Sequence, residues 1–183
     1  MRLCIVFLGL IMVFLPACQE VTTAVDVDNR AIFFDLKDFF QKEKARLEKI
    51  NSFKKTVSIN GVSEEKTLTT LNFDNELSIF IASDINRPAW SDKYKVDSVF
   101  TAQKKLSQIK YTVLDESLKT KKVAIDFQNN AVANIEIEKA TDNAVAQSKQ
   151  TLSYHVGKGY AIKSEQALSL SDTKTILVQV EYQ

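Results

Sequence analysis

The strongest constraint on the fold is an alternation of apolar and polar residues with a period of two. It is clearest at 109–113, where three apolar residues alternate with Lys110 and Thr112. It recurs at 123–127, 133–137, 152–156, 160–162 and 176–182. Such segments are typical of half-buried β-strands. Turn residues separate them at Asn129-Asn130 and Gly157-Lys158-Gly159, so the second half predicts an antiparallel sheet with one solvated face.

The period differs at 30–51, which is predicted to be an amphipathic helix capped by Asp28 or Asn29. Five apolar residues share one helical face: Phe33, Leu36, Phe40, Leu47 and Ile50. Phe40 is expected in the helix–sheet interface, and Glu43 on the solvent side. The helix could alternatively lie on a membrane, but its mixed charges favour packing onto the sheet.

Between the helix and the clear strands, the pattern predicts a strand at 57–59, an Asn60-Gly61 turn and a second strand at 68–73. Residues 77–82 are apolar on both faces and indicate a central strand. Residues 83–92 form the longest break, and 93–100 are either a weak strand or a loop. The fold class is α+β: an N-terminal amphipathic helix packed on a curved, mostly antiparallel, half-barrel-like sheet.

The first eighteen residues indicate where the protein resides. Arg2 precedes an apolar run at 3–15, which has the length of a secretory signal core and is too short to span a bilayer. The run ends in Leu15-Pro16-Ala17-Cys18, which resembles the lipobox of bacterial lipoproteins. The resemblance implies a diacylglycerol on the Cys18 sulfur, cleavage before Cys18 and an acyl chain on the new amine. Ordinary secretion and an uncleaved anchor are the alternatives, but Leu15 at position −3 suits ordinary cleavage poorly.

The lipobox divides the chain into a signal peptide (1–17), a lipidated tether (18–29) and a single α+β domain (30–183). In the lipoproteins that this resembles, Asp after the cysteine favours retention in the inner membrane. Gln19 therefore indicates a lipid-anchored protein of the cell envelope, at the outer membrane.

Composition excludes several partners and chemistries. Removal of residues 1–17, which include Arg2, leaves 23 basic and 23 acidic residues. A neutral chain gives no electrostatic reason to expect nucleic acid as a partner. Both cysteines, Cys4 and Cys18, lie at the N-terminus, so the folded part has no thiol for disulfides, catalysis or metal binding.

A leading helix followed by an antiparallel meander resembles the periplasmic lipoprotein-carrier family (LolA and LolB), whose half-open barrel holds acyl chains. The pattern also resembles lipoproteins of the Bacteroidota. Neither resemblance rests on a motif, so neither assigns a functional residue.

Candidate catalytic groups are sparse, and the sequence predicts no enzyme, no metal site and no cofactor beyond the acyl groups on Cys18. His155 is the only histidine, is expected to face solvent, and cannot supply a usual zinc site alone. Asp84, Asn86 and Asp92 lack the spacing of a calcium loop. The constellation that a hydrolase needs is therefore missing.

One loop is a candidate binding site. Arg87 and Trp90, residue types enriched at binding hot spots, share the 83–92 segment, and Tyr94 follows it. The alternative is that Trp90 folds back as a plug over the sheet end.

These features favour a membrane-anchored, non-enzymatic envelope lipoprotein that binds an apolar ligand or lipid. The alternative is an accessory or structural subunit of an outer-membrane protein complex. The first predicts a cleft between helix and sheet or an exposed aromatic loop. The second predicts a filled core and a flat apolar surface patch.

The lipobox is testable by Cys18→Ser. The serine oxygen does not replace the thiol in lipid transfer, so we expect an unprocessed precursor without acyl chains. Detergent partitioning and intact mass measure this directly. A processed, membrane-bound variant with the mass of the acylated protein would contradict the lipobox.

Overall fold

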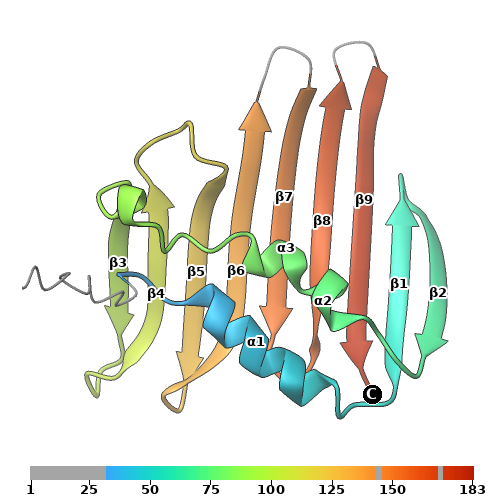
Figure 1. The fold of residues 1–183 in the computed structure, drawn as a ribbon, viewed down its shortest axis with the longest axis horizontal. Coiled ribbons are helices and arrows are strands. Elements are labelled where there is room, and N and C mark those ends of the chain that lie inside the picture. The colour runs from blue at the N-terminus through green and yellow to red at the C-terminus, as the bar shows by residue number, and fades with distance from the viewer. Residues whose placement is uncertain (1–31, 143–145, 169–170) are drawn as a thin grey trace, which may run out of the picture. The chain divides into compact units, whose positions relative to one another are not determined.

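Nine strands form one open, antiparallel sheet in the computed structural model, which describes residues 32–142, 146–168 and 171–183. The predicted signal peptide, the tether and the first residues of the predicted helix lie outside these ranges. The antiparallel sheet expected from the alternation is confirmed, and it is open rather than closed into a barrel (Figure 1).

The sheet is a meander to which the first hairpin is added at one end. Its order is β2-β1-β9-β8-β7-β6-β5-β4-β3, so β1 pairs with the last strand of the chain. The strands are β1 (Phe53–Ile59), β2 (Val62–Leu68), β3 (Tyr94–Phe100), β4 (Leu106–Val113), β5 (Thr120–Gln128), β6 (Ala131–Asp142), β7 (Ala146–His155), β8 (Gly159–Leu168) and β9 (Ser171–Tyr182).

This order makes residues 69–93 cross the whole sheet. The segment leaves β2 at one edge and must reach β3 at the other, eight strand spacings or roughly 38 Å away. It does so across a single face, and its short helices cover that face on the way (Figure 1). The helical layer is thus a consequence of placing the first hairpin beside the last strand.

Helix α1 (Leu36–Leu47) crosses the same face. It is shorter than predicted, because its N-cap is Asp35, whose carboxylate accepts a hydrogen bond from the Asp38 amide at 2.7 Å. The predicted caps, Asp28 and Asn29, lie outside the described part. Its buried residues recur at helical spacing: Leu36, Phe40, Glu43 and Leu47.

The central strand predicted at 77–82 is wrong, because this stretch is helical. It consists of Leu77, the C-cap of α2 (Phe73–Glu76), followed by α3 (Ser78–Ile81) and its C-cap Ala82. Phe73, Leu77 and Phe80 are buried and follow steps of four and three residues, a helical face that the short apolar run conceals.

Two neighbouring predictions also change. The strand expected at 68–73 ends at Leu68, and Asn72 instead caps α2 by accepting a hydrogen bond from the Asn75 amide. The ambiguous segment 93–100 forms the edge strand β3. The 83–92 break contains a short 3-10 helix, η1 (Pro88–Trp90).

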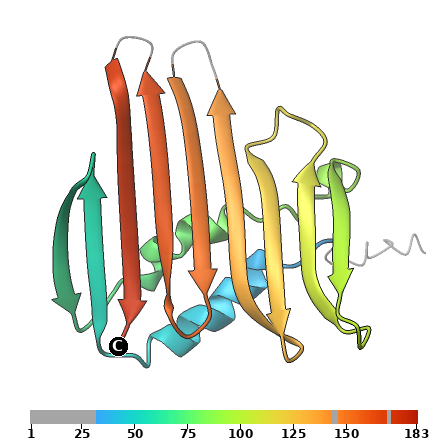
Figure 2. The ribbon, with the colours of Figure 1, turned by 180° about the vertical axis from the view of Figure 1, so that it is seen from behind.

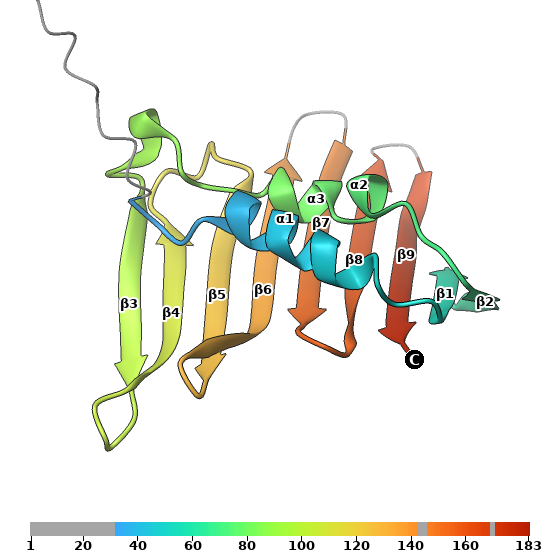
Figure 3. The same cartoon turned by 60° about the horizontal axis from the view of Figure 1, so that its bottom comes forward.

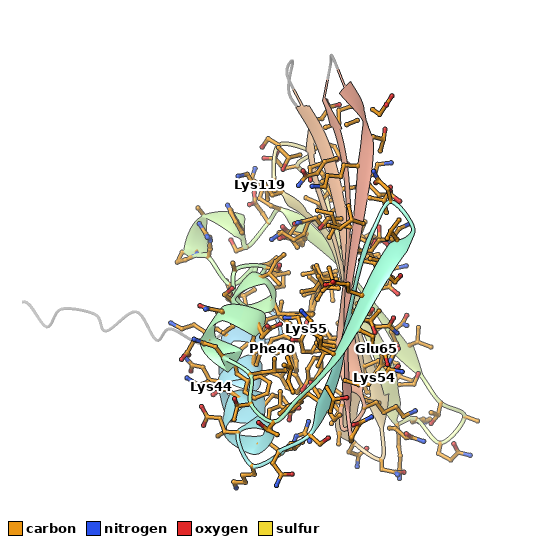
Figure 4. The ribbon with its side chains drawn as sticks, turned by 90° about the vertical axis from the view of Figure 1, so that its right-hand side faces the viewer. Phe40, Lys44, Lys54, Lys55, Glu65 and Lys119 are labelled. Atoms are coloured by element: carbon orange, nitrogen blue, oxygen red, sulfur yellow. The ribbon has the colours of Figure 1, made fainter. Side chains whose placement is uncertain are left out.

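The two faces of the sheet differ in chemistry. All the helices lie on one face, here called the helix face (Figure 3). In the described part of the chain, the other face carries no helix (Figure 2). Neighbouring residues of β1 illustrate the alternation: Lys55 points toward the helices, whereas Lys54 points away and ion-pairs with Glu65 at 3.0 Å (Figure 4).

The core lies between α1, α3 and the middle strands. Phe40 is fully buried there (Figure 4), as predicted. Its ring packs against Phe80 of α3 at 4.9 Å between centroids, and edge-on against Tyr154 of β7 at 5.1 Å. Tyr154 also contacts Phe39 and Phe80, so one tyrosine joins both helices to the sheet.

Candidate functional site

The predicted loop brings Arg87 and Trp90 together. The Arg87 guanidinium lies over the Trp90 ring, 4.4 Å from its centroid, a cation–π arrangement. Trp90 is half-buried and packs against the core, whereas Arg87 is exposed. The Arg87 guanidinium is therefore exposed at the surface, whereas part of the Trp90 indole packs over the core, as the plug alternative predicts.

Tyr94 does not share that surface. It is 5% exposed and donates a hydrogen bond to the Thr120 carbonyl at 2.9 Å. Burial raises its pKa to about 12. Tyr94 therefore anchors the start of β3 in the core, and only Arg87 and part of Trp90 remain available to a partner.

The other polar residues of this loop hold the chain that enters α1. The Asn86 side chain accepts a hydrogen bond from the Phe33 amide at 2.9 Å, and its amide donates to the carbonyls of Phe33 and Phe34. Asp84 accepts a hydrogen bond from the Asn86 amide at 2.7 Å. Two of the three residues considered for calcium are thus engaged with backbone amides.

A buried polar cluster under α1 was not predicted. Glu43 is 9% exposed, so its predicted place on the solvent side is wrong. The Tyr154 hydroxyl donates to its carboxylate at 2.5 Å, and Arg46 donates to the same group at 2.7 Å. The Arg46 side chain, 38% exposed, lies over the Tyr182 ring at 6.0 Å. A buried carboxylate needs such partners.

A second cluster of the same composition lies beside it. Glu76, at the end of α2, accepts a hydrogen bond from the Tyr160 hydroxyl and pairs with Lys55 of β1 at 2.5 Å. Tyr160 is the direct cross-strand partner of Tyr154. Each cluster therefore joins a helical carboxylate to a strand tyrosine and a cation, which fixes α1 and α2 on the sheet.

These contacts fill the centre of the helix–sheet interface. The residues that meet there are fully buried: Phe40, Phe80, Tyr154 and Leu152. Burial also raises the pKa of Tyr154 and of Tyr160 well above its usual range, so both hydroxyls stay protonated donors at neutral pH. The clusters thus have the chemistry of a structural clamp.

An exposed apolar surface lies instead at the β3–β4 edge. Val96 and Phe100 of β3 are 51% and 60% exposed. They lie two and six residues after the buried Tyr94, so their side chains share its face of the strand, the helix face. Helix α1 does not reach them there. Half-buried neighbours extend the surface, because Phe100 pairs with Leu106 and Ile109 follows on β4. We call these four residues the apolar corner.

Basic residues adjoin the apolar corner. Lys104 and Lys105 occupy the exposed turn between β3 and β4, where Lys104 has a positive φ of 58°. Neither lysine makes a salt bridge within the part of the chain that the structure describes. The corner therefore combines exposed apolar side chains with unpaired positive charge.

The described chain also begins near this edge. Phe33 packs edge-on against Tyr94 and Tyr111 at 5.8 and 5.3 Å between centroids. Ile32, just before it, is 59% exposed. The described part of the chain therefore begins beside β3 and β4.

Polar hollows lie elsewhere on the sheet. One of about 460 Å³ is lined by residues that include Lys122, Glu138, Ala140 and Lys149. Lys122 already pairs with Glu138 and Glu136 at 2.9 Å each. His155 is exposed, as predicted, and its Nδ1 lies 2.7 Å from the Asn134 side-chain oxygen. His155 lines a separate hollow with Ser153 and Lys158, and the described residues around the 460 Å³ hollow include paired charges but no histidine.

Within the described ranges, no group of three or more His, Cys, Asp or Glu side chains is arranged to hold a metal ion. Across the same ranges, no helix has the length and hydropathy needed to span a membrane. Cys18, the predicted lipidation site, lies outside them. No protein-family model, curated protein or solved structure matches this chain.

The apolar corner was missed because the sequence pattern gives no reason to treat 93–100 as an edge strand. Which strands lie next to 93–100 depends on the order of all the strands in the sheet. The Glu43 cluster did carry a signal, because position 43 falls between Phe40 and Leu47 on the apolar stripe. An acid at such a position indicates a buried partner.

The tyrosines make stability sensitive to alkaline pH. The chain has five tyrosines, and burial is the main reason why the pKa of each is raised. The pKa values of Tyr94 and Tyr182 rise to about 12. In the unfolded chain they ionise near pH 10. The folded state therefore binds more protons above about pH 10, and its stability must fall as pH rises through that range.

We expect tyrosinate absorbance at 295 nm to appear only together with loss of the folded circular dichroism signal, at a midpoint above pH 10. Several tyrosines that ionise near pH 10 in a protein with intact dichroism would contradict their burial.

Proposed function

We propose that this chain is a membrane-anchored, non-enzymatic lipoprotein of the cell envelope that binds lipid through the apolar corner. The observation that carries the proposal is the exposure of Phe100 and Val96 beside unpaired lysines. Apolar side chains favour acyl chains, and lysines favour anionic headgroups. The lipobox supplies the anchor, and Gln19 favours the outer membrane.

The position of Ile32, the first described residue, supports this assignment. The thirteen residues at 19–31 separate Cys18 from Ile32, and the next residue, Phe33, packs against Tyr94 of β3 and Tyr111 of β4. Anchoring at Cys18 therefore raises the local concentration of membrane at this edge of the sheet. Two or more acyl chains hold a protein stably, so the corner needs only to orient the domain.

The proposal differs from the lipoprotein carriers that the sequence resembles. Those proteins hold acyl chains inside a half-open barrel, whereas here Phe40, Phe80 and Tyr154 occupy the helix–sheet interface. A half-barrel-like cavity for an apolar ligand would require this aromatic cluster to open. The apolar corner exposes apolar side chains without any need to separate the helices from the sheet.

The alternative function, an accessory subunit of an outer-membrane protein complex, is favoured by a different observation. Strand β3 is an edge strand, so one side of its backbone is available to pair with another protein. Val99, on the polar side of this strand, is also 52% exposed. A protein partner would therefore meet apolar side chains on both faces of the edge.

A fluorophore on the β3–β4 turn tests the proposal. The acylated chain has no free thiol, so an Ala102→Cys variant accepts one environment-sensitive label. In vesicles of phosphatidylethanolamine and phosphatidylglycerol, we expect blue-shifted emission and quenching by nitroxide lipids. Phe100 is 60% exposed in the free domain, so its burial in lipid contributes about 1–2 kcal/mol, and Phe100→Ser should lower the equilibrium constant for insertion about fivefold or more.

Leu114→Ser is the matched control, because Leu114 is 64% exposed but lies outside the corner. It should leave the quenching unchanged. A label that stays in water while the protein remains on the vesicles would contradict lipid binding. Shielding of that label only in native envelope membranes would favour the accessory subunit.

A further inference from the structure

A second hollow lies on the helix face, above the helices. It has a volume of about 220 Å³ and is lined by Lys119, Lys139, Ala140, Thr141, Ser148 and Gln150. Lys139 and Thr141 lie two and four residues after the buried Ile137, and Gln150 and Ser148 lie two and four residues before the buried Leu152. Residues an even number of positions apart share one face of a strand, so all four lie on the helix face. Lys119 lies on this side of the sheet in Figure 4. We call this hollow the lysine basin.

The charges of the lysine basin are unbalanced. The described residues that line it include two lysines and no carboxylate. The adjoining hollow of about 460 Å³ shares Lys139 with the basin and includes Glu116 and Glu138, but these two carboxylates pair with Lys121 and Lys122. Nearby lysines have partners: Lys121 pairs with Glu116 at 2.9 Å, and Lys122 with Glu136 and Glu138.

Lys119 and Lys139 have no salt-bridge partner anywhere in the described ranges. Lys139 is also half-buried. Burial lowers the pKa of its ammonium group, and the nearby charge of Lys119 lowers it further. Two cations thus face one hollow without a counter-charge, which is unfavourable unless a negative ligand joins them.

The surrounding groups complete a donor set. Thr141 and Ser148 carry hydroxyls, and Gln150 carries an amide whose nitrogen lies 3.1 Å from the Ser164 hydroxyl. Hydroxyl and ammonium donors suit an acceptor-rich anion. The volume far exceeds the roughly 30 Å³ that one water occupies, so a phosphate-sized group fits.

We propose that Lys119 and Lys139, with the hydroxyls of Thr141 and Ser148, bind a phosphate group. The same chemistry is offered by free phosphate and by the headgroup of an anionic phospholipid. The site is independent of the apolar corner, since it lies near the other ends of the strands and involves no residue of the corner.

Lysine acetylation read by mass spectrometry tests the site on the full chain in non-ionic detergent. Acetylation of each lysine is compared in inorganic phosphate and in chloride at equal ionic strength. We expect phosphate to slow the modification of Lys119 and Lys139 at least threefold, and that of Lys42 and Lys49, which are exposed and lie outside both proposed sites, by no more than the experimental error. The second arm replaces phosphate with vesicles containing phosphatidylglycerol, compared with phosphatidylcholine alone.

Lys139→Gln should abolish the protection of Lys119, because one ammonium group does not hold the anion. Lys149→Gln is the matched control: it removes the same charge from β7, next to Ala140 but on the opposite face. It should preserve the protection, and melting temperatures establish that both variants are folded.

If only phosphate protects Lys119 and Lys139 from acetylation, the ligand of the lysine basin is a free anion. If only anionic vesicles protect them, the ligand is a lipid headgroup. Failure of both arms, or equal protection of all lysines, would overturn the proposal. So would protection of Lys119 that survives Lys139→Gln.

Discussion

The structure depends on one contact, the packing of the helical layer on Tyr154. A nine-stranded open sheet with one apolar face is not stable in water unless that face is covered. Tyr154 contacts α1 and α3 through its ring and donates its hydroxyl to Glu43. The contact thus combines apolar burial with satisfaction of a buried carboxylate, and it fixes both the position and the rotation of α1.

Because aromatic side chains fill the centre of the helix–sheet interface, the side chains that are free to bind a ligand lie at its margins. The sheet extends beyond the helices in two directions, and each uncovered region of the helix face has its own character. The β3–β4 edge leaves apolar residues exposed, whereas the ends of β6 and β7 leave Lys119 and Lys139 around a polar hollow. Both proposed binding surfaces therefore lie around the filled centre of the helix–sheet interface and not within it.

Much of the sheet could be predicted from the sequence, because strands such as 109–113 and 133–137 repeat one strong pattern between good turns. The helices at 73–81 could not, since a short apolar run reads equally well as a buried strand, and only Phe73, Leu77 and Phe80 together reveal the helical period. The apolar corner and the lysine basin depend on which strands are neighbours. That order follows from the pairing of β1 with β9, which no local pattern encodes.

A double-mutant cycle between Glu43 and Tyr154 tests the central claim most directly. Free energies of unfolding would be measured for Glu43→Gln, Tyr154→Phe and the double variant. Each single change should cost about 1–3 kcal/mol, because Tyr154→Phe removes a donor from the buried carboxylate, and Glu43→Gln removes the charge that pairs with Arg46 and strengthens the hydrogen bond from Tyr154. The double variant should cost less than the sum by about 1 kcal/mol or more. Additivity within about 0.5 kcal/mol, with single changes close to neutral, would contradict the role of this contact in holding the helical layer.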